Sequence, residues 1–219
     1  MRRSFLRITA VFLFTASLLF AASLCLAGVR WTANGVELRG TDVSGSALSP
    51  QITSNGSGGA IVTWRDQRSG GPWELYAQRV DSSGTPQWTA DGVEFRGTGV
   101  SGSALNPQIT TDGSGGAIVT WEDNRSGSQS DIFVQRVNSS GVPQWTANGV
   151  ELRGAGMINS AYDPQITPDG SGGAIVTWKD RRDGEWDIYA QRVDSSGVPQ
   201  WTVNGVQLRG AGLASGADN

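Results

Sequence analysis

The sequence predicts an all-β fold assembled from a repeated unit. The first observation is a passage that occurs three times, in which Trp64, Trp121 and Trp178 occupy equivalent places 57 residues apart. The second is that each copy contains four short segments rich in β-branched and aromatic residues, separated by Gly, Ser, Pro and Asp. The third is that no segment has a helical period of useful length. Units of this kind predict a β-propeller-like array of three four-stranded antiparallel blades plus an extra strand segment.

The first 27 residues differ from the repeats and predict a signal helix. A basic start, "MRRSFLR", precedes the apolar run "ITAVFLFTASLLFAASLCLA", and Ala27 offers a small residue at a cleavage site. This pattern is typical of a secretory signal peptide, although an uncleaved anchor is an alternative. Leu24 argues against a lipoprotein site at Cys25, because a small residue is expected there. We therefore expect a secreted, periplasmic or cell-surface protein that meets a membrane only through this segment.

The composition of the processed chain excludes several classes of function. Removing Arg2, Arg3 and Arg7 reduces Lys+Arg from 17 to 14 against 20 acids, a net charge of 14 − 20 = −6. An acidic surface argues against a nucleic-acid partner. Without His or Cys, the processed chain cannot use His-based acid–base catalysis, catalytic triads, thiol nucleophiles, disulfides or ordinary zinc sites. We expect no metal and no cofactor, because the Gly-rich turns also lack the ligands for calcium and precede no phosphate-binding helix.

Within each unit the predicted strands follow a fixed order, which the second copy illustrates. "PQIT" (107–110) is followed by the turn-forming "DGSGG", and "GAIVTW" (116–121) then alternates between two faces. After the loop "EDNRSGSQS", the segment "DIFVQRV" (131–137) alternates in the same way. "GVELRG" (149–154) is the short fourth strand. A lone sheet of this kind cannot bury both of its faces, so we expect the units to stack face to face.

The predicted organisation is a signal peptide at 1–27 and a repeat domain at 28–219. The repeats run from about 31 to 87, 88 to 144 and 145 to 200, with a partial repeat at 201–219. Three blades are fewer than an ordinary closed propeller has. The chain is then a fragment of a longer array, a complete chain that closes by self-association, or an open arc with exposed edges. The spare copy of the fourth strand, at 31–40, is either a donor strand for another chain or a cap on the first blade.

The passage "DGSGGAIVTW…DIYAQRVDSSGVPQWT" resembles the SBBP-type β-propeller repeats of secreted and surface bacterial proteins. Over about residues 29–212 the chain shares their order of Asp-Gly-Ser-Gly, hydrophobic strand, aromatic strand and Asp-Ser-Ser-Gly. It departs from them in its "WxDxR" hairpin and its "PQWTxNGV" segment. The segment "TTDGSGGAIVTW" is similar to the sialidase Asp-box but has a different spacing. The resemblance implies a β-propeller fold and says little about function.

Acidic and basic residues recur at fixed places in the repeats, and we interpret them as structural. Each copy carries a Trp-x-Asp-x-Arg hairpin, which supplies the pairs Asp66 and Arg68, Asp123 and Arg125, and Asp180 and Arg182. A residue that every blade needs must appear in every blade, so we expect these pairs to brace the hairpins. Three equivalent ligand-binding points are the alternative.

The variable loops are better candidates for a binding surface. The loop after the second strand and the loop leading to the next blade are expected at the same end of the array, and these are the loops that differ among copies. Trp73, Trp186 and Tyr162 lie there and are candidate ligand-binding residues, as aromatic platforms for a glycan or a protein. Drift in unconstrained loops, with the aromatic rings folded back onto the blades, is the alternative.

On these grounds we expect a non-enzymatic protein for protein or surface binding and assembly, with no catalytic residues. Its partner would be a protein or glycan on a surface, and a homo-oligomer would close the propeller. A lectin that binds carbohydrate at repeated sites on the loop face is the alternative. A fragment of a secreted glycoside hydrolase or lyase is the third hypothesis, because Asp163 is a carboxylate where the other copies have Ser49 and Asn106.

Overall fold

The computed structural model describes residues 31–40, 42–68, 70–97, 99–127, 129–154 and 156–208. The predicted signal segment at 1–27 and the end of the partial repeat at 209–219 lie outside the described residues. Among the residues described, the regular secondary structure consists of β-strands. No helix in this part of the chain is long and apolar enough to cross a membrane.

The described strands form three sheets of four, one for each repeat, which we name blades 1, 2 and 3. Blade 1 comprises β1 (Ala47–Ser54), β2 (Ala60–Asp66), β3 (Glu74–Val80) and β4 (Val93–Glu94). Blade 2 comprises β5 (Ala104–Thr111), β6 (Ala117–Asp123), β7 (Asp131–Val137) and β8 (Val150–Glu151). Blade 3 comprises β9 (Ala161–Pro168), β10 (Ala174–Asp180), β11 (Asp187–Val193) and β12 (Val206–Gln207). Within each blade, every strand pairs antiparallel with the next along the chain, which confirms the predicted propeller-like array of blades.

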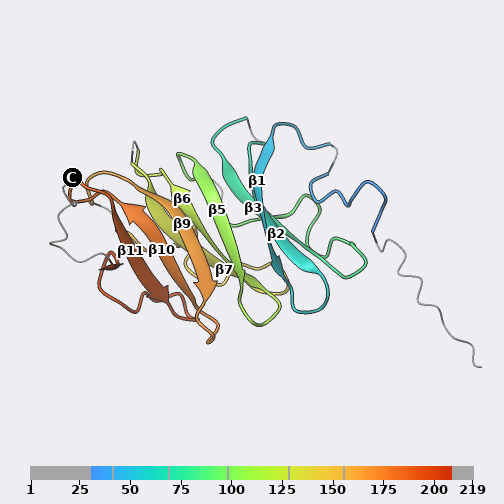
Figure 1. Ribbon diagram of the computed structural model, residues 1–219. Helices are drawn as coiled ribbons and strands as arrows, with labels where there is room; N and C mark the ends of the chain where they lie inside the picture. The colour runs from blue at the N-terminus through green and yellow to red at the C-terminus, as the bar shows by residue number, and fades with distance from the viewer. Residues whose placement is uncertain are drawn as a thin grey trace, which may run out of the picture.

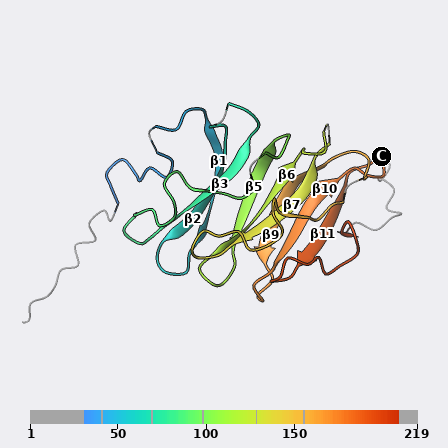
Figure 2. The same ribbon diagram turned by 180° about the vertical axis from the view of Figure 1, so that it is seen from behind.

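The blades lie side by side in chain order, and Figure 1 and Figure 2 show this arrangement from opposite sides. Their facing surfaces form the hydrophobic core. Ile61 and Leu75 of blade 1 pack against Val119 and Trp121 of blade 2, and all four are fully buried. An equivalent cluster lies between blades 2 and 3. Face-to-face stacking therefore buries both sides of the middle sheet, which explains why β6 is buried along its whole length.

The spare segment at 31–40 lies against blade 1. Its Trp31 Nε1 donates to the Ser82 carbonyl at 3.3 Å, and its Arg39 Nε donates to Asp66 at 2.9 Å. The segment forms no β-ladder with the described strands. It therefore acts as a cap on blade 1 within this chain.

Candidate functional site

The candidate site is a cleft where the first strands of the three blades meet. β1 contacts β5, and β5 contacts β9, so the first strands of successive blades lie next to one another (Figure 1). The cleft between them has a volume of about 350 Å³ and is mostly polar. Its lining consists of Ser49, Gln51, Asn106, Pro107, Gln108, Asp163, Pro164 and Gln165. We call it the axial cleft.

A β-bulge in each inner strand forms the lining. One extra residue in β1 shifts its register with β2 between Leu48 and Gln51, and β5 and β9 have equivalent shifts. The bulged residues Ser49, Asn106 and Asp163 have positive φ angles of 55°, 47° and 52°. Asn and Asp tolerate this left-handed conformation better than most residues, whereas Ser adopts it at a higher conformational energy. Such strain gathers at functional sites, and bulges often re-aim a side chain beside one.

Among the described residues, Asp163 is the one carboxylate that lines the axial cleft. Its side chain is 57% exposed, and its Oδ2 lies 2.5 Å from Nζ of Lys179 on the neighbouring strand. The structure thus brings Asp163 together with its repeat equivalents Ser49 and Asn106, which the sequence had aligned. The exposed Asp163 carboxylate is positioned to accept hydrogen bonds from a ligand in the cleft.

Glu122 lies next to the cleft and bonds to two of the residues that line it. It is almost fully buried, and its Oε1 accepts hydrogen bonds from Asn106 Nδ2 at 2.9 Å and from the Asp163 backbone N–H at 2.8 Å. Burial raises the pKa of the Glu122 carboxyl above its ordinary value, although the hydrogen bond from Asn106 opposes the rise. Asp163 and Glu122 are therefore two neighbouring carboxyl groups in contrasting surroundings.

The structure brings two of the three candidate aromatic residues together. The Tyr162 and Trp186 rings have centroids 5.9 Å apart at a 54° tilt, beside Asp163 and Lys179. Trp73 is separate: the Arg65 guanidinium stacks 4.6 Å from its ring centroid. The backbone of Trp73 bonds to blade 2, so it belongs to the contact between blades.

The Asp and Arg residues of the three hairpins lie in ion-pair networks away from the axial cleft. Asp123 is fully buried and accepts from Trp121 Nε1 at 2.8 Å, from Arg125 Nη2 at 2.5 Å and from Arg96 Nε at 2.8 Å. Asp66 and Asp180 have the same three kinds of partner. Burial opposes ionisation of Asp123, but the bonds from Arg125, Arg96 and Trp121 outweigh it and hold its pKa below the ordinary value.

Sequence reasoning missed two members of the candidate site, Glu122 and Lys179. Both occupy the variable position of the Trp-x-Asp-x-Arg hairpin, where blade 1 has Arg65. A change of charge at one position of an otherwise uniform hairpin was the available signal. Sequence reasoning also missed Arg96 and Arg153. Both are fully buried, and each forms an ion pair with the next blade.

Within the described ranges, no group of three or more His, Cys, Asp or Glu residues is arranged to hold a metal ion. The axial cleft offers one carboxylate, one hydroxyl and several amide groups. These groups suit hydrogen bonding to hydroxyl-rich, uncharged ligands.

The fold is similar to that of solved glycoside hydrolases. An α-L-arabinanase from Penicillium chrysogenum, solved with arabinobiose, matches with a TM-score of 0.51 and 14% identity, over 77% of this chain and 54% of that one. An α-L-arabinofuranosidase from Fusarium graminearum, solved with an iminosugar inhibitor, matches with a TM-score of 0.50 and 14% identity, over 78% of this chain and 53% of that one. The chain thus spans about half the length of these two structures. No family model and no curated protein matches the sequence, so the resemblance to SBBP-type repeats stays a prediction.

These comparisons overturn the prediction of a non-enzymatic binding protein. The solved structures that share the fold are an α-L-arabinanase and an α-L-arabinofuranosidase, so a fold of this kind does not indicate a non-enzymatic protein. The physical reason for the error is clear. Lack of His and Cys excludes imidazole and thiol chemistry, but glycoside hydrolysis uses carboxyl groups, which the chain retains.

Proposed function

We propose that this protein is a secreted glycoside hydrolase that acts on an uncharged polysaccharide in the axial cleft. The observation that carries the proposal is Asp163, a carboxylate that a strained bulge presents in a polar cleft at the meeting point of three blades. The fold of the matched hydrolases supports it. The predicted signal peptide would deliver the protein to polysaccharides outside the cell.

Asp163 is the group assigned to contact the sugar. Glycoside hydrolysis uses carboxyl groups that reach the sugar. Asp163 lines the cleft, and its side chain is exposed and paired with Lys179. Because Glu122 is almost fully buried and bonds to the Asp163 backbone, we assign it a positioning role for the bulge.

The lining favours an uncharged glycan over an acidic one. Gln51, Gln108 and Gln165 occupy the same place in the three inner strands, one from each blade. Their amides donate to and accept from sugar hydroxyls. An acidic polysaccharide would need unpaired cations in the cleft, whereas Lys179 is already paired with Asp163.

The test is the release of reducing ends from a panel of neutral polysaccharides that includes arabinan. We expect the processed wild-type protein to cleave at least one of them, and Asp163→Asn to reduce that activity by roughly a thousandfold, the scale of losing a reacting group. Asn keeps the left-handed backbone that position 163 requires. Glu185→Gln changes an exposed acid outside the cleft and should leave activity unchanged. No cleavage across the panel, or equal activity in Asp163→Asn, would contradict the proposal.

A further inference from the structure

Blades 1 and 2, and blades 2 and 3, are joined by the same kind of face-to-face contact. Each end of the array leaves one of the two faces of such a contact without a partner blade. Each internal contact has a trailing face on one blade and a leading face on the next. The trailing face of blade 3 includes Ile175, Trp186, Ile188 and Leu208, together with the charged Lys179 beside Trp186. The leading face of blade 1 consists of Ala47, Ile52, Val62 and Trp64. Neither face is covered by a described blade.

The apolar side chains on the trailing face of blade 3 are exposed. Ile188 is 41% exposed and Leu208 is 59% exposed. Their equivalents inside the array are covered completely: Leu75 and Ile132 correspond to Ile188 and are both fully buried. A side chain that is core in two blades is therefore surface in the third.

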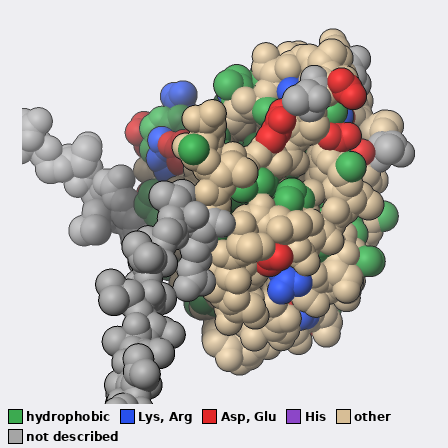
Figure 3. Space-filling view, turned by 90° about the vertical axis from the view of Figure 1, so that its right-hand side faces the viewer, with side chains coloured by type: hydrophobic (Ala, Val, Ile, Leu, Met, Phe, Trp, Pro, Cys, Tyr) green, Lys and Arg blue, Asp and Glu red, His purple; other side chains and the backbone are tan. Residues whose placement is uncertain are grey.

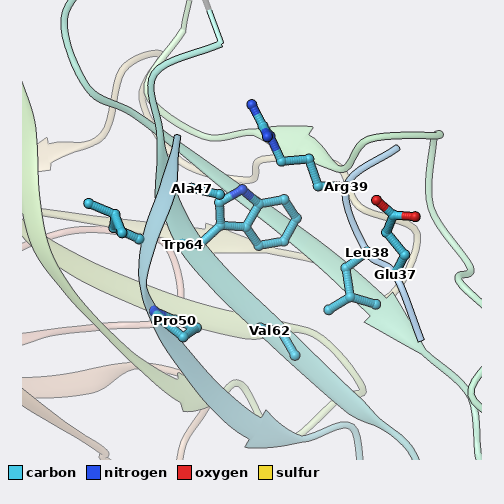
Figure 4. Close-up of a pocket in the computed structure, with 8 residues that line it drawn as sticks. Glu37, Leu38, Arg39, Ala47, Pro50, Val62 and Trp64 are labelled. Carbon is cyan, nitrogen blue, oxygen red and sulfur yellow. The ribbon is translucent and has the colours of Figure 1, made fainter. Parts of the chain in front are cut away.

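The leading face of blade 1 also exposes side chains that are buried in the other blades. Ile52 is 65% exposed, and Ala47 is exposed where its equivalents Ala104 and Ala161 are fully buried. A mostly apolar cleft of about 310 Å³ lies on this face, between Leu38 of the cap and Val62 and Trp64 (Figure 4). Figure 3 views the molecule from the side of blade 1 and shows exposed hydrophobic side chains there.

Hydrogen-bonding groups at the two ends match as well. Inside the array, the Trp73 carbonyl accepts from Ala104 N–H at 2.8 Å, and the Ser130 carbonyl accepts from Ala161 N–H at 2.8 Å. The corresponding groups at the ends are the Trp186 carbonyl on blade 3 and the Ala47 N–H on blade 1. These two groups would form the same bond if blade 3 of one molecule met blade 1 of another.

The cap at 31–40 occupies the place that such a blade would need. Its sequence, WTANGVELRG, is identical at eight of ten positions to WTVNGVQLRG at 201–210, which follows the third strand of blade 3. Arg39 of the cap pairs with Asp66 at 2.9 Å, as Arg96 pairs with Asp123 at 2.8 Å inside the array. Residues 201–208 of a second molecule carry the side chains that fit this place.

We propose that a second copy of this chain docks the trailing face of its blade 3 onto the leading face of blade 1, repeating the internal contact. In the single chain, the cap at 31–40 occupies the position; in the complex, residues 201–208 of the second copy displace the cap. The contact joins two different faces of the chain. If the rotation between successive copies closes, the copies form a ring; otherwise they form an open, growing assembly. This inference does not depend on the proposed enzymatic function.

Light scattering on a size-exclusion column tests it with the processed full-length protein. The wild type should show a mass that rises with concentration toward two or more chains, over a roughly hundredfold range. Ile188→Glu and Ile52→Glu each place a charge in the contact and should weaken association at least tenfold. Val203→Glu is the control: Val203 is 82% exposed and its equivalents Ala90 and Ala147 stay exposed inside the array, so association should not change.

A fourth variant tests the displacement of the cap. Leu38→Ala removes an apolar contact that holds residues 31–40 on blade 1, without touching Asp66, and should strengthen association several-fold. Circular dichroism confirms that each variant is folded. A monomeric mass at every concentration for both the wild type and Leu38→Ala would overturn the proposal. Association that Ile188→Glu and Val203→Glu leave equally intact would overturn it too.

Discussion

At the scale of single residues, the molecule depends on buried carboxylates that are fully partnered. Asp123 is fully buried with Arg96, which is also fully buried, while Arg125 stacks 3.8 Å from the Phe133 ring centroid. Every oxygen of Asp123 therefore faces a donor. A charge buried in this way contributes to stability only while its partners stay in place.

Asp123→Asn should lower the free energy of unfolding at pH 7 by about 3 kcal/mol, because it leaves the Arg96 charge buried with a neutral partner. Since the folded pKa of Asp123 is lowered, its contribution is complete above the ordinary value of 3.8 and is lost as the pH falls through the lowered value. The deficit should therefore shrink in acid. Urea unfolding at pH 7 and below pH 4 measures it, with exposed Asp42→Asn as the control. Equal effects of the two substitutions at pH 7 would contradict the assignment.

Glu122 makes the opposite prediction, because burial raises its folded pKa. Its ionisation costs stability as the pH rises above the ordinary value of 4.5, where the unfolded state ionises first. Glu122→Gln keeps an acceptor for Asn106 and Asp163 but removes this cost. The variant should match the wild type near pH 4 and exceed its stability at pH 7, as measured by urea unfolding. A stability difference that is the same at both pH values would show that Glu122 is not under this strain.

At the scale of the strands and turns, a tryptophan of one blade packs onto a glycine in a turn of the next blade. Gly141 of blade 2 has a φ of +84°, and a Cβ there would lie 2.8 Å from Cγ of Trp88, which lies between β3 and β4 of blade 1. The Trp88 indole donates to the Ser139 carbonyl at 3.0 Å, in the same turn. The glycine is thus required both by backbone conformation and by the closeness of the ring.

Gly141→Ala should destabilise the protein more than Gly113→Ala. Gly113 has a similar φ of +75° but nothing within 4 Å of its Cβ position. Both variants lose about 1 kcal/mol from the left-handed conformation, and Gly141→Ala loses a further ~1–3 kcal/mol from the clash with Trp88. Thermal unfolding of the two variants measures the difference. If their midpoints fall together, the packing of Trp88 on this turn contributes nothing.

The sequence predicts a strand well where the local pattern of residues determines that strand. β6 and β7 follow the predicted alternation, because β-branched and aromatic residues determine strands locally. β5 begins at Ala104, three residues before the predicted "PQIT", because a bulge carries the strand through Asn106 and Pro107. Such a bulge has no simple sequence signature.

The candidate site shows the same limit. Aligning the repeats places Ser49, Asn106 and Asp163 at one position, and this was enough to single out Asp163. That the three meet in one cleft, with Glu122 of blade 2 bonded to the Asp163 backbone of blade 3, depends on how the blades stack. Contacts between repeats are set by packing, which no single repeat encodes.

At the scale of the whole molecule, stacking produces both of the surfaces that carry the proposals. The inner strands converge and form the axial cleft, and the outermost faces remain as unmatched halves of the internal contact. An added copy would place further inner strands around the same axis. Assembly and the cleft are therefore linked by geometry, although each has its own test.

The most direct measurement for the central claim is the turnover rate of the processed protein on the neutral polysaccharide that it cleaves, compared with Asp163→Asn under the same conditions. We expect Asp163→Asn to lower kcat roughly a thousandfold. The melting temperature should stay unchanged, because Asp163 is exposed and Asn suits its backbone. A variant that keeps the wild-type kcat would show that the axial cleft is not where the reaction takes place.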